Sequence, residues 1–349
     1  MKKLVFRVDA GNDIGTGHLM RCLALAQKWQ DTGGKAVFIT TCRNENLLRR
    51  LRVEGFSVRL LPGANPGTEN DWNKTREVIA DYDTGWLVLD GYHFNEVYQQ
   101  NIKDAGYKLL AIDDMAQLEH YYADVILNQN LHAGQSCYCC QPDTRLLLGS
   151  EYVLLRREFL AYENKKRETV ETAKKILVTM GGADARNYTS ETIRALQKMD
   201  IPQLEAVVVI GANNPHKDTV EAIAKESPVP VNIIRNADNM PQFMAQTDIA
   251  VCSAGATVWE LAFMGVPSVI AATTPVEEYL IEGLREYGLF TSLNWVNGFS
   301  ESELINTLSK LITDKEARRN MSELGRNLVD GWGCNRVIRA IIDSGQNNE

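Results

Sequence analysis

The stretch that decides the fold is Ile14-Gly15-Thr16-Gly17-His18-Leu19-Met20-Arg21. It joins an apolar run at 4–8, which predicts a buried strand, to an amphipathic run at 19–31, which predicts a helix. Gly15 and Gly17 let the backbone approach a ligand closely, and the helix that follows directs free N–H groups at that ligand. The turn therefore predicts an anion-binding site. An alternative stays open, in which the glycines only close the turn and His18 caps the helix.

His18 is the candidate catalytic residue of this turn. It lies at or next to the first helical turn, where the helix dipole penalises a positive charge. We therefore expect its imidazole to be neutral near pH 7. A neutral imidazole can accept a proton, as a general base must.

Length and charge narrow the class of protein. With 349 residues, 44% of them hydrophobic, the chain can form two domains with separate cores. The net charge of −8 and the absence of a basic run longer than Lys165-Lys166-Arg167 argue against nucleic acid as a partner, while an anionic small molecule is allowed. The first residues fit neither a signal peptide nor a membrane span, which predicts a cytoplasmic protein without a membrane span. A monomer is plausible, and the oligomeric state is left open.

Metal and disulfide chemistry are not expected. Seven cysteines are scattered along the chain, an odd number unlike a disulfide framework. The cluster Cys137-Tyr138-Cys139-Cys140 has no second pair of metal ligands at a suitable spacing. We therefore predict no metal site and no cofactor.

Apolar runs alternate with helical patterns through the first half of the chain, which is typical of a parallel sheet covered on both faces. Three of these runs, at 4–8, 86–90 and 108–112, end in carboxylates: Asp9, Asp90, Asp113 and Asp114. Ligands of such sheets bind beyond the carboxyl ends of the strands, so these side chains are expected on the functional edge with His18. Each could instead be a turn former or a helix cap.

The second half repeats this pattern. A strand at 175–180 is followed by the turn Gly181-Gly182-Ala183-Asp184, and a strand at 248–252 is followed by Ser253-Ala254-Gly255-Ala256-Thr257 and a helix carrying Glu260. Small and hydroxyl residues at a helix start can bind phosphate, and Glu260 can accept the two hydroxyls of a ribose. The alternative is a capping arrangement completed by Glu260.

These patterns predict an α/β protein with two Rossmann-like parallel-sheet domains. The N-terminal domain spans 1–156 and carries His18, a linker region spans 157–174, and a nucleotide-binding C-terminal domain spans 175–330. A C-terminal helix and tail at 331–349 could pack back on the first domain.

Six segments in a shared order resemble the UDP-2,4-diacetamido-2,4,6-trideoxy-β-L-altropyranose hydrolases of pseudaminic acid biosynthesis. The resemblance extends to spore-coat polysaccharide proteins and to MurG-like GT-B glycosyltransferases, and it covers nearly the whole chain. The segments are 15–21, Ile112-Asp113-Asp114, Leu127-Asn128-Gln129-Asn130, 152–159, 180–184 and 253–261.

The resemblance implies a GT-B-like fold whose two domains face each other across a cleft. It implies a metal-independent UDP-sugar hydrolase that releases UDP and the free sugar by attack of water at the anomeric carbon. His18 would be the base, and Arg156 would contact the substrate. The other expected contacts to the nucleotide-sugar are Gly15, Gly17, Gly182, Asp184, Ser253, Gly255, Thr257 and Glu260.

One departure bears on the substrate. The family has Glu-Asn-Gln where this chain has Pro275-Val276-Glu277-Glu278, so a substrate-binding amide is missing and the sugar is left open. A glycosyltransferase with a UDP-sugar donor and a non-catalytic nucleotide-sugar binding protein are the alternatives. The remaining histidines are expected in surface or turn positions, with His120, near Asp113 and Asp114, the best further candidate: His93, His120, His132 and His216.

Overall fold

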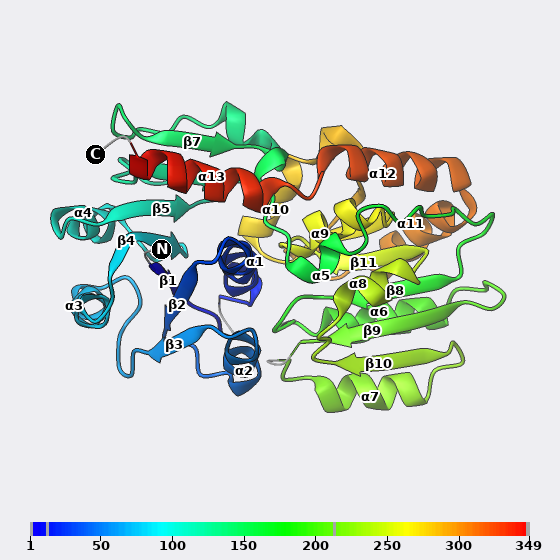
Figure 1. Ribbon diagram of the computed structural model, residues 1–349. Coiled ribbons are helices and arrows are strands. Elements are labelled where there is room, and N and C mark those ends of the chain that lie inside the picture. The colour runs from blue at the N-terminus through cyan, green and yellow to red at the C-terminus, as the bar shows by residue number, and fades with distance from the viewer. Residues whose placement is uncertain (1–2, 12–13, 212–213, 347–349) are drawn as a thin grey trace. The chain divides into compact units, whose positions relative to one another are not determined.

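The computed structural model describes residues 3–11, 14–211 and 214–346. The chain divides into two compact units (Figure 1). Unit 1 comprises Met1–Arg157 and Gly331–Glu349, and unit 2 comprises Glu158–Asp330. Each unit contains one parallel sheet with helices on its faces. The two Rossmann-like parallel-sheet domains predicted from the sequence are confirmed.

Unit 1 is built on a seven-stranded sheet in the order β3-β2-β1-β4-β5-β6-β7. All of its neighbouring strands pair in parallel. The strands are β1 (Lys3–Val8), β2 (Lys35–Thr40), β3 (Ser57–Leu60), β4 (Thr84–Asp90), β5 (Lys108–Ile112), β6 (Val125–Asn128) and β7 (Arg145–Leu148). The helices are α1 (Gly17–Asp31), α2 (Glu45–Val53), α3 (Glu69–Ala80), α4 (Glu96–Asp104) and α13 (Gly333–Gln346), with a short α5 (Arg157–Leu160) at the boundary of the unit.

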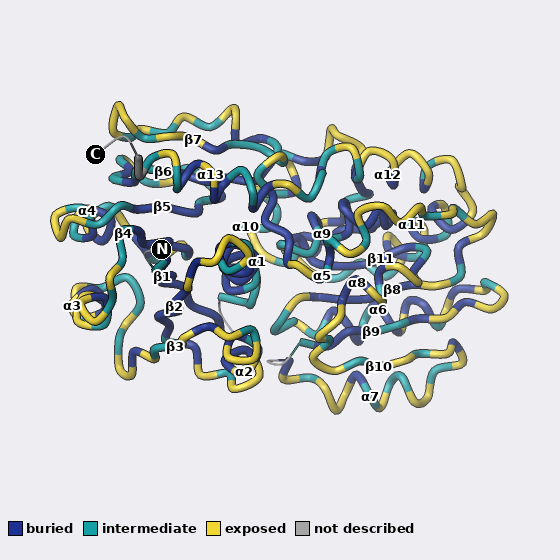
Figure 2. Tube along the Cα trace, viewed as in Figure 1, coloured by how far each residue is buried: buried dark blue, intermediate teal, exposed yellow. Residues whose placement is uncertain are grey.

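Two apolar cores cover the faces of this sheet, and the strands supply them alternately. In β1, Leu4, Phe6 and Val8 enter the core formed with α1, α2 and α13, whereas Val5 enters the core formed with α3 and α4. Side chains on a strand alternate between faces, so a strand buried on both sides must be apolar throughout. Figure 2 shows the central strands buried and the outer turns of the covering helices exposed.

The structure adds elements that the sequence patterns did not predict. Strand β7, helix α4 and strand β13 (Thr291–Asn294) were not predicted because each is short or only partly buried. Helix α3 begins at Glu69, where the Thr68 side chain accepts from the Asp71 N–H and caps the helix.

Unit 2 has a six-stranded parallel sheet in the order β10-β9-β8-β11-β12-β13. Its other strands are β8 (Lys175–Thr179), β9 (Glu205–Ile210), β10 (Val231–Arg235), β11 (Ile249–Ser253) and β12 (Ser268–Ala272). Its helices are α6 (Tyr188–Gln197), α7 (Lys217–Lys225), α8 (Met240–Ala245), α9 (Thr257–Met264), α10 (Pro275–Glu282), α11 (Glu301–Thr313) and α12 (Lys315–Leu328).

In both sheets the strand order reverses direction next to the first strand. The two reversal points lie between β1 and β4 in unit 1 and between β8 and β11 in unit 2. Open α/β sheets bind ligands at such points, beyond the carboxyl ends of the strands. The candidate turns at 14–17, 181–184 and 253–257 come after β1, at the end of β8 and at the end of β11.

The C-terminal helix α13 belongs to unit 1 and packs against α1. Its residues Val337, Ile338 and Ile341 join the same core as Leu23 of α1. Within the described ranges, no helix has the length and apolar character needed to cross a lipid bilayer.

Candidate active site

His18 is held by a carboxylate from the neighbouring strand. Its Nδ1 lies 2.6 Å from Oδ1 of Asp90, the last residue of β4. The pairing of Val8 with Asp90 brings the end of β4 beside the turn that leads from β1 into α1. The side chain of His18 does not cap the helix, since α1 begins after Thr16 without a side-chain cap. The alternative that His18 is a helix cap is therefore wrong.

Arg21, one turn further along α1, links two carboxylates. Its Nε and Nη2 donate to Asp90 at 2.7 Å each, and its Nη1 and Nη2 donate to Asp114 at 2.8 and 2.9 Å. Charge-assisted hydrogen bonds made by a planar guanidinium in pairs are among the strongest in proteins. We call Arg21, Asp90, Asp114 and His18 the His18 cluster.

The cluster is buried, and the charges within it determine which of its side chains are protonated. Burial alone would raise the pKa of the Asp90 carboxyl, but Arg21 and then His18 more than offset burial and hold that pKa well below its usual range. The pKa of Asp114 is likewise lowered, because Arg21 outweighs the effect of burial. Both carboxylates are therefore ionised at neutral pH, and the proton between His18 and Asp90 resides on Nδ1.

Tyr92 packs against the His18 cluster. Its hydroxyl donates to Asp114 at 2.9 Å, and its ring packs edge-on against the imidazole with ring centroids 4.9 Å apart. Burial, followed by the charge of Asp114, raises the pKa of the Tyr92 hydroxyl, so this group is a hydrogen-bond donor at neutral pH. Asn130 also donates to Asp114, at 3.1 Å. Asp114 thus receives hydrogen bonds from three side chains.

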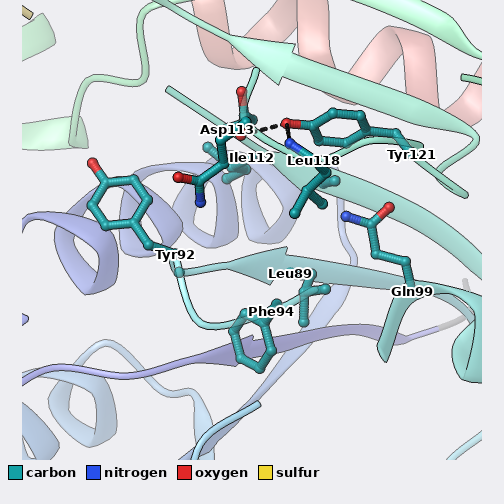
Figure 3. A pocket seen from close by; sticks show the side chains of 11 residues that line it. Leu89, Tyr92, Phe94, Gln99, Ile112, Asp113, Leu118 and Tyr121 are labelled. Atoms are coloured by element: carbon teal, nitrogen blue, oxygen red, sulfur yellow. Dashed lines mark hydrogen bonds between the residues drawn. The ribbon is translucent and has the colours of Figure 1, made fainter. Parts of the chain in front are cut away.

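A small pocket adjoins Tyr92 at the ends of β4 and β5. Figure 3 shows Tyr92 and Phe94 on the loop after β4, with Asp113 and Tyr121 opposite them. The cavity volume is about 20 Å³, enough for a water molecule. Asp113 takes part in a separate set of contacts, accepting from the hydroxyls of Tyr121 and Tyr138 at 3.0 and 2.8 Å.

The chemistry available to His18 follows from these contacts. With Nδ1 facing Asp90, the lone pair is on Nε2, for which the described part of the chain provides no hydrogen-bond partner. A histidine oriented by a carboxylate, with its other nitrogen open, is the arrangement of a general base. Gly15, with φ of 75°, precedes α1, and Gly17 is its first residue.

Of the four carboxylates predicted at this edge, two join His18 and two do not. Asp90 and Asp114 belong to the His18 cluster, Asp113 contacts tyrosines, and Asp9 pairs with Arg7 at 2.7 Å. His120, expected at a surface or turn position and named only as a further candidate, does not join the His18 cluster. It is partly exposed, with Nδ1 3.4 Å from Sγ of Cys139 and Nε2 3.2 Å from the side-chain nitrogen of Gln141.

In unit 2, Gly182 and Asp184 have defined structural neighbours. A Cβ at Gly211, after β9, would collide with the backbone of Gly182, so the two turns are in close contact. The Asp184 carboxylate accepts from the N–H groups of Tyr188 and Thr189 at 2.8 and 2.9 Å and thereby caps α6. Capping is a structural role for Asp184; its predicted contact with substrate stays a prediction.

The second turn follows β11. Ser253 is the last residue of β11 and is 9% exposed. Gly255 is exposed, and α9 begins at Thr257 without a side-chain cap. The N–H groups of Val258 and Trp259 already donate to the carbonyls of Gly255 and Ala256 at 3.0 and 3.2 Å, so an anion could use only the N–H groups just before them. A Cβ at Gly181 would lie 3.4 Å from the Ser253 hydroxyl, which brings the turn after β8 beside this one. Glu260 lies partly buried on the first turns of α9.

Two further positions named from the sequence are now placed. Arg156 is buried, at 8% exposure, in the segment before α5. Glu277, where the substrate-binding amide was missing, accepts from the N–H and hydroxyl of Thr273 at 2.7 and 2.6 Å. Burial raises the pKa of its carboxyl. The side chain therefore organises the loop after β12.

Several known proteins are similar to the chain. The Glycosyltransferase family 28 C-terminal domain model matches residues 175–275. Spore coat polysaccharide biosynthesis protein SpsG of Bacillus subtilis is 25% identical, with 96% of each chain covered. The UDP-2,4-diacetamido-2,4,6-trideoxy-β-L-altropyranose hydrolase of Campylobacter jejuni is 25% identical, over 74% of this chain and 87% of that protein. The chain is a relative of these proteins. The resemblance noted in the sequence is thus confirmed.

The fold comparison agrees. MurG of Acinetobacter baumannii superposes with a TM-score of 0.67 at 15% identity, covering 98% of this chain and 99% of that chain. The predicted GT-B-like fold is confirmed. The family 28 match contains both turns of unit 2 described above and ends at Pro275, two residues before Glu277.

Sequence reasoning missed two members of the site, Arg21 and Tyr92. Arg21 was in the quoted motif, and its spacing of three residues from His18 places both on one helix face. That spacing was the signal that could have identified it. Tyr92 follows Asp90 by two residues and has no periodic signal of its own.

Proposed function

We propose that the protein is an enzyme acting on a UDP-activated sugar, and that it hydrolyses this substrate. The products are UDP and free 2,4-diacetamido-2,4,6-trideoxy-L-altrose or a related sugar, a step of pseudaminic acid biosynthesis. The observation that carries the proposal is the His18 ring, fixed by Asp90 through Nδ1 at the sheet's reversal point with Nε2 open.

In the proposed reaction, a water oxygen attacks the anomeric carbon while Nε2 of His18 accepts a proton from that water. The bond between the anomeric carbon and the phosphate oxygen breaks, and its electron pair leaves with UDP. Asp90 stabilises the imidazolium that forms, while Arg21 keeps the carboxylate in place through two hydrogen bonds. No metal is required for either half of this step.

Unit 2 is proposed to bind the nucleotide. The uncapped start of α9, with Ser253, Gly255 and Thr257, suits the diphosphate, and Glu260 suits the ribose hydroxyls. Gly15, Gly17, Gly182 and Arg156 complete the proposed substrate contacts. The similarity to the named hydrolase supports this assignment.

The test measures product release from UDP-2,4-diacetamido-2,4,6-trideoxy-β-L-altropyranose and a panel of other UDP-sugars, without an acceptor. In ¹⁸O-labelled water the label should enter the sugar and not UDP. His18→Ala should lower the rate by roughly 10²- to 10⁴-fold, the usual contribution of a general base. His120→Ala is the matched control, because His120 is partly exposed and its contacts with Cys139 and Gln141 lie outside the cluster. Label in UDP, or an unaffected His18→Ala variant, would refute the mechanism.

A glycosyltransferase is the second candidate, favoured by the family 28 match at 175–275. In that case the sugar would stay attached to UDP until an acceptor is added. Binding of UDP with no turnover under either condition would indicate a non-catalytic nucleotide-sugar binding protein.

A further inference from the structure

Unit 1 contains a second cluster of one arginine, two aspartates and one histidine: Arg7, Asp9, Asp71 and His93. We call it the His93 cluster. Arg7 is fully buried in β1 and donates to Asp71 through Nε and Nη2 at 3.0 and 2.8 Å. Its Nη1 lies 2.7 Å from Oδ2 of Asp9. The composition is that of the His18 cluster, although no residue is shared.

Asp9 is fixed from several sides. Its Oδ1 accepts from the N–H and the hydroxyl of Thr41 at 2.7 and 2.8 Å, and its Oδ2 faces both Arg7 and His93. Burial would raise the pKa of the Asp9 carboxyl, but the contacts with His93 and Arg7 hold it well below its usual range. Asp9 is therefore a permanent negative charge beside the His93 ring.

The two nitrogens of His93 have different surroundings. Nε2 is buried and lies 3.2 Å from Oδ2 of Asp9, a charge contact without hydrogen-bond geometry. Because this oxygen is ionised, the nitrogen that faces it carries the proton. Nδ1 has no hydrogen-bond partner among the residues that the structure describes, and the side chain is 21% exposed. The ring rests on Phe94 with centroids 4.1 Å apart. One nitrogen is thus anchored, and the other is open to a ligand.

The backbone of two neighbouring loops approaches His93 closely. Gly91, with φ of 150°, lies so close that a Cβ there would be 2.7 Å from Cε1 of His93. Gly67, with φ of 78°, contacts the His93 carbonyl, and any Cβ there would collide with it. Two loops therefore approach the histidine at positions that favour glycine.

Both histidines lie at the same reversal point of the sheet. Asp9 directly follows β1, His93 lies three residues beyond the end of β4, and these strands are paired. The residue before His93 is Tyr92, whose ring packs on His18. The loop after β4 thus carries both Tyr92, which packs on His18, and His93 of the second cluster.

We propose that His93 is a substrate-contacting residue whose Nδ1 forms a hydrogen bond with a hydroxyl of the substrate's sugar. The inference rests on the proposed function, since it deepens the assignment of the same sheet edge. A hydroxyl fits because it can donate to a bare ring nitrogen or accept from a protonated one. Recognition of a sugar hydroxyl would make His93 a determinant of which UDP-sugar is used.

The decisive variant is His93→Gln. Its side-chain amide nitrogen can take the place of Nε2 and keep the contact with Asp9, but nothing replaces Nδ1. We expect unchanged thermal stability, an unchanged Kd for UDP alone, and a loss of roughly 3- to 10-fold in kcat/KM for UDP-2,4-diacetamido-2,4,6-trideoxy-β-L-altropyranose, as for one neutral hydrogen bond. His120→Gln is the control and should match the wild type in all three.

A purely structural role gives a different pattern. If His93 only ties the loops to Asp9, His93→Gln retains wild-type kcat/KM, while His93→Ala loses thermal stability; that result overturns the proposal. If the wild type releases no UDP from this substrate, the proposed function fails separately. Calorimetry then decides the role of His93, because His93→Gln should weaken binding of the UDP-sugar and not of UDP.

Discussion

Replacing Arg21 by methionine gives the sharpest test of the electrostatics of unit 1. Methionine fills much of the same volume but has no charge, so Asp90 and Asp114 lose four hydrogen bonds of 2.7 to 2.9 Å. The two buried carboxylates would then face each other without a cation. Because removing one partner leaves an uncompensated buried charge, the cost exceeds the value of the bonds themselves.

The expected magnitude follows from this loss. Breaking a buried ion pair by removing one partner costs about 3–5 kcal/mol. For a unit of this size each kcal/mol lowers Tm by a few degrees, so we expect a fall of roughly 6–20 °C. The loss of stability in the Arg21→Met variant should be largest at neutral pH. The wild-type carboxyls have lowered pKa values, so their contribution is present above the unfolded pKa of about 3.9 and lost as the pH falls.

In the Arg21→Met variant the same carboxyls are buried without a cation, which disfavours their ionised form. As the pH falls towards 4 these carboxyls take up protons, so burying them costs less and the difference from wild type should shrink. Urea unfolding at pH 7 and at pH 4 measures the loss of unfolding free energy relative to wild type at each pH. Arg52→Met is the control, since Arg52 pairs with Glu45 at the surface and should change stability by less than about 1 kcal/mol. If the two variants lose equal stability at pH 7, or if the Arg21→Met deficit grows on acidification, the reasoning is wrong.

Two further predictions concern unit 2. Asp184→Ala should lower the free energy of unfolding by about 1 kcal/mol through loss of the α6 cap, whereas Asp184→Asn, which can still accept the N–H groups, should lose less; chemical denaturation measures both. Gly211→Ala should cost about 1–3 kcal/mol, because its Cβ meets the backbone of Gly182 and neither loop can yield by rotating a side chain. Gly134→Ala, which meets open space, is the control and should stay within about 0.5 kcal/mol of wild type.

The sequence allowed the first turn and its sheet to be predicted because the signals are local. The apolar run before Gly15 and the helical pattern after His18 each occupy adjacent residues, and each has a single periodicity. The rule that ligands bind at carboxyl ends of parallel strands then places Asp90 and Asp114 near His18 without knowledge of any contact. The structure agrees on both carboxylates.

The remaining contacts depend on strand register, which the local pattern does not contain. His18 meets Asp90 because β1 pairs with β4, and Asp114 reaches Arg21 because β5 pairs with β4. His93 looked like an ordinary turn residue for the same reason, since its partner Asp9 lies 84 positions earlier in the chain. Long-range pairs of this kind are fixed by the order of the strands and not by spacing along the sequence.

The two clusters share a physical logic that the helix-dipole argument for His18 did not include. In each, an arginine neutralises a buried aspartate enough to keep it ionised, and the aspartate in turn requires the proton on the histidine nitrogen that faces it. The opposite nitrogen is then left for a ligand: Nε2 in His18 and Nδ1 in His93. Arginine thus acts on the histidine through the aspartate, although Arg21 Nη2 also lies 3.1 Å from His18 Nδ1. Removing the arginine should disturb the chemistry before it disturbs the position of the ring.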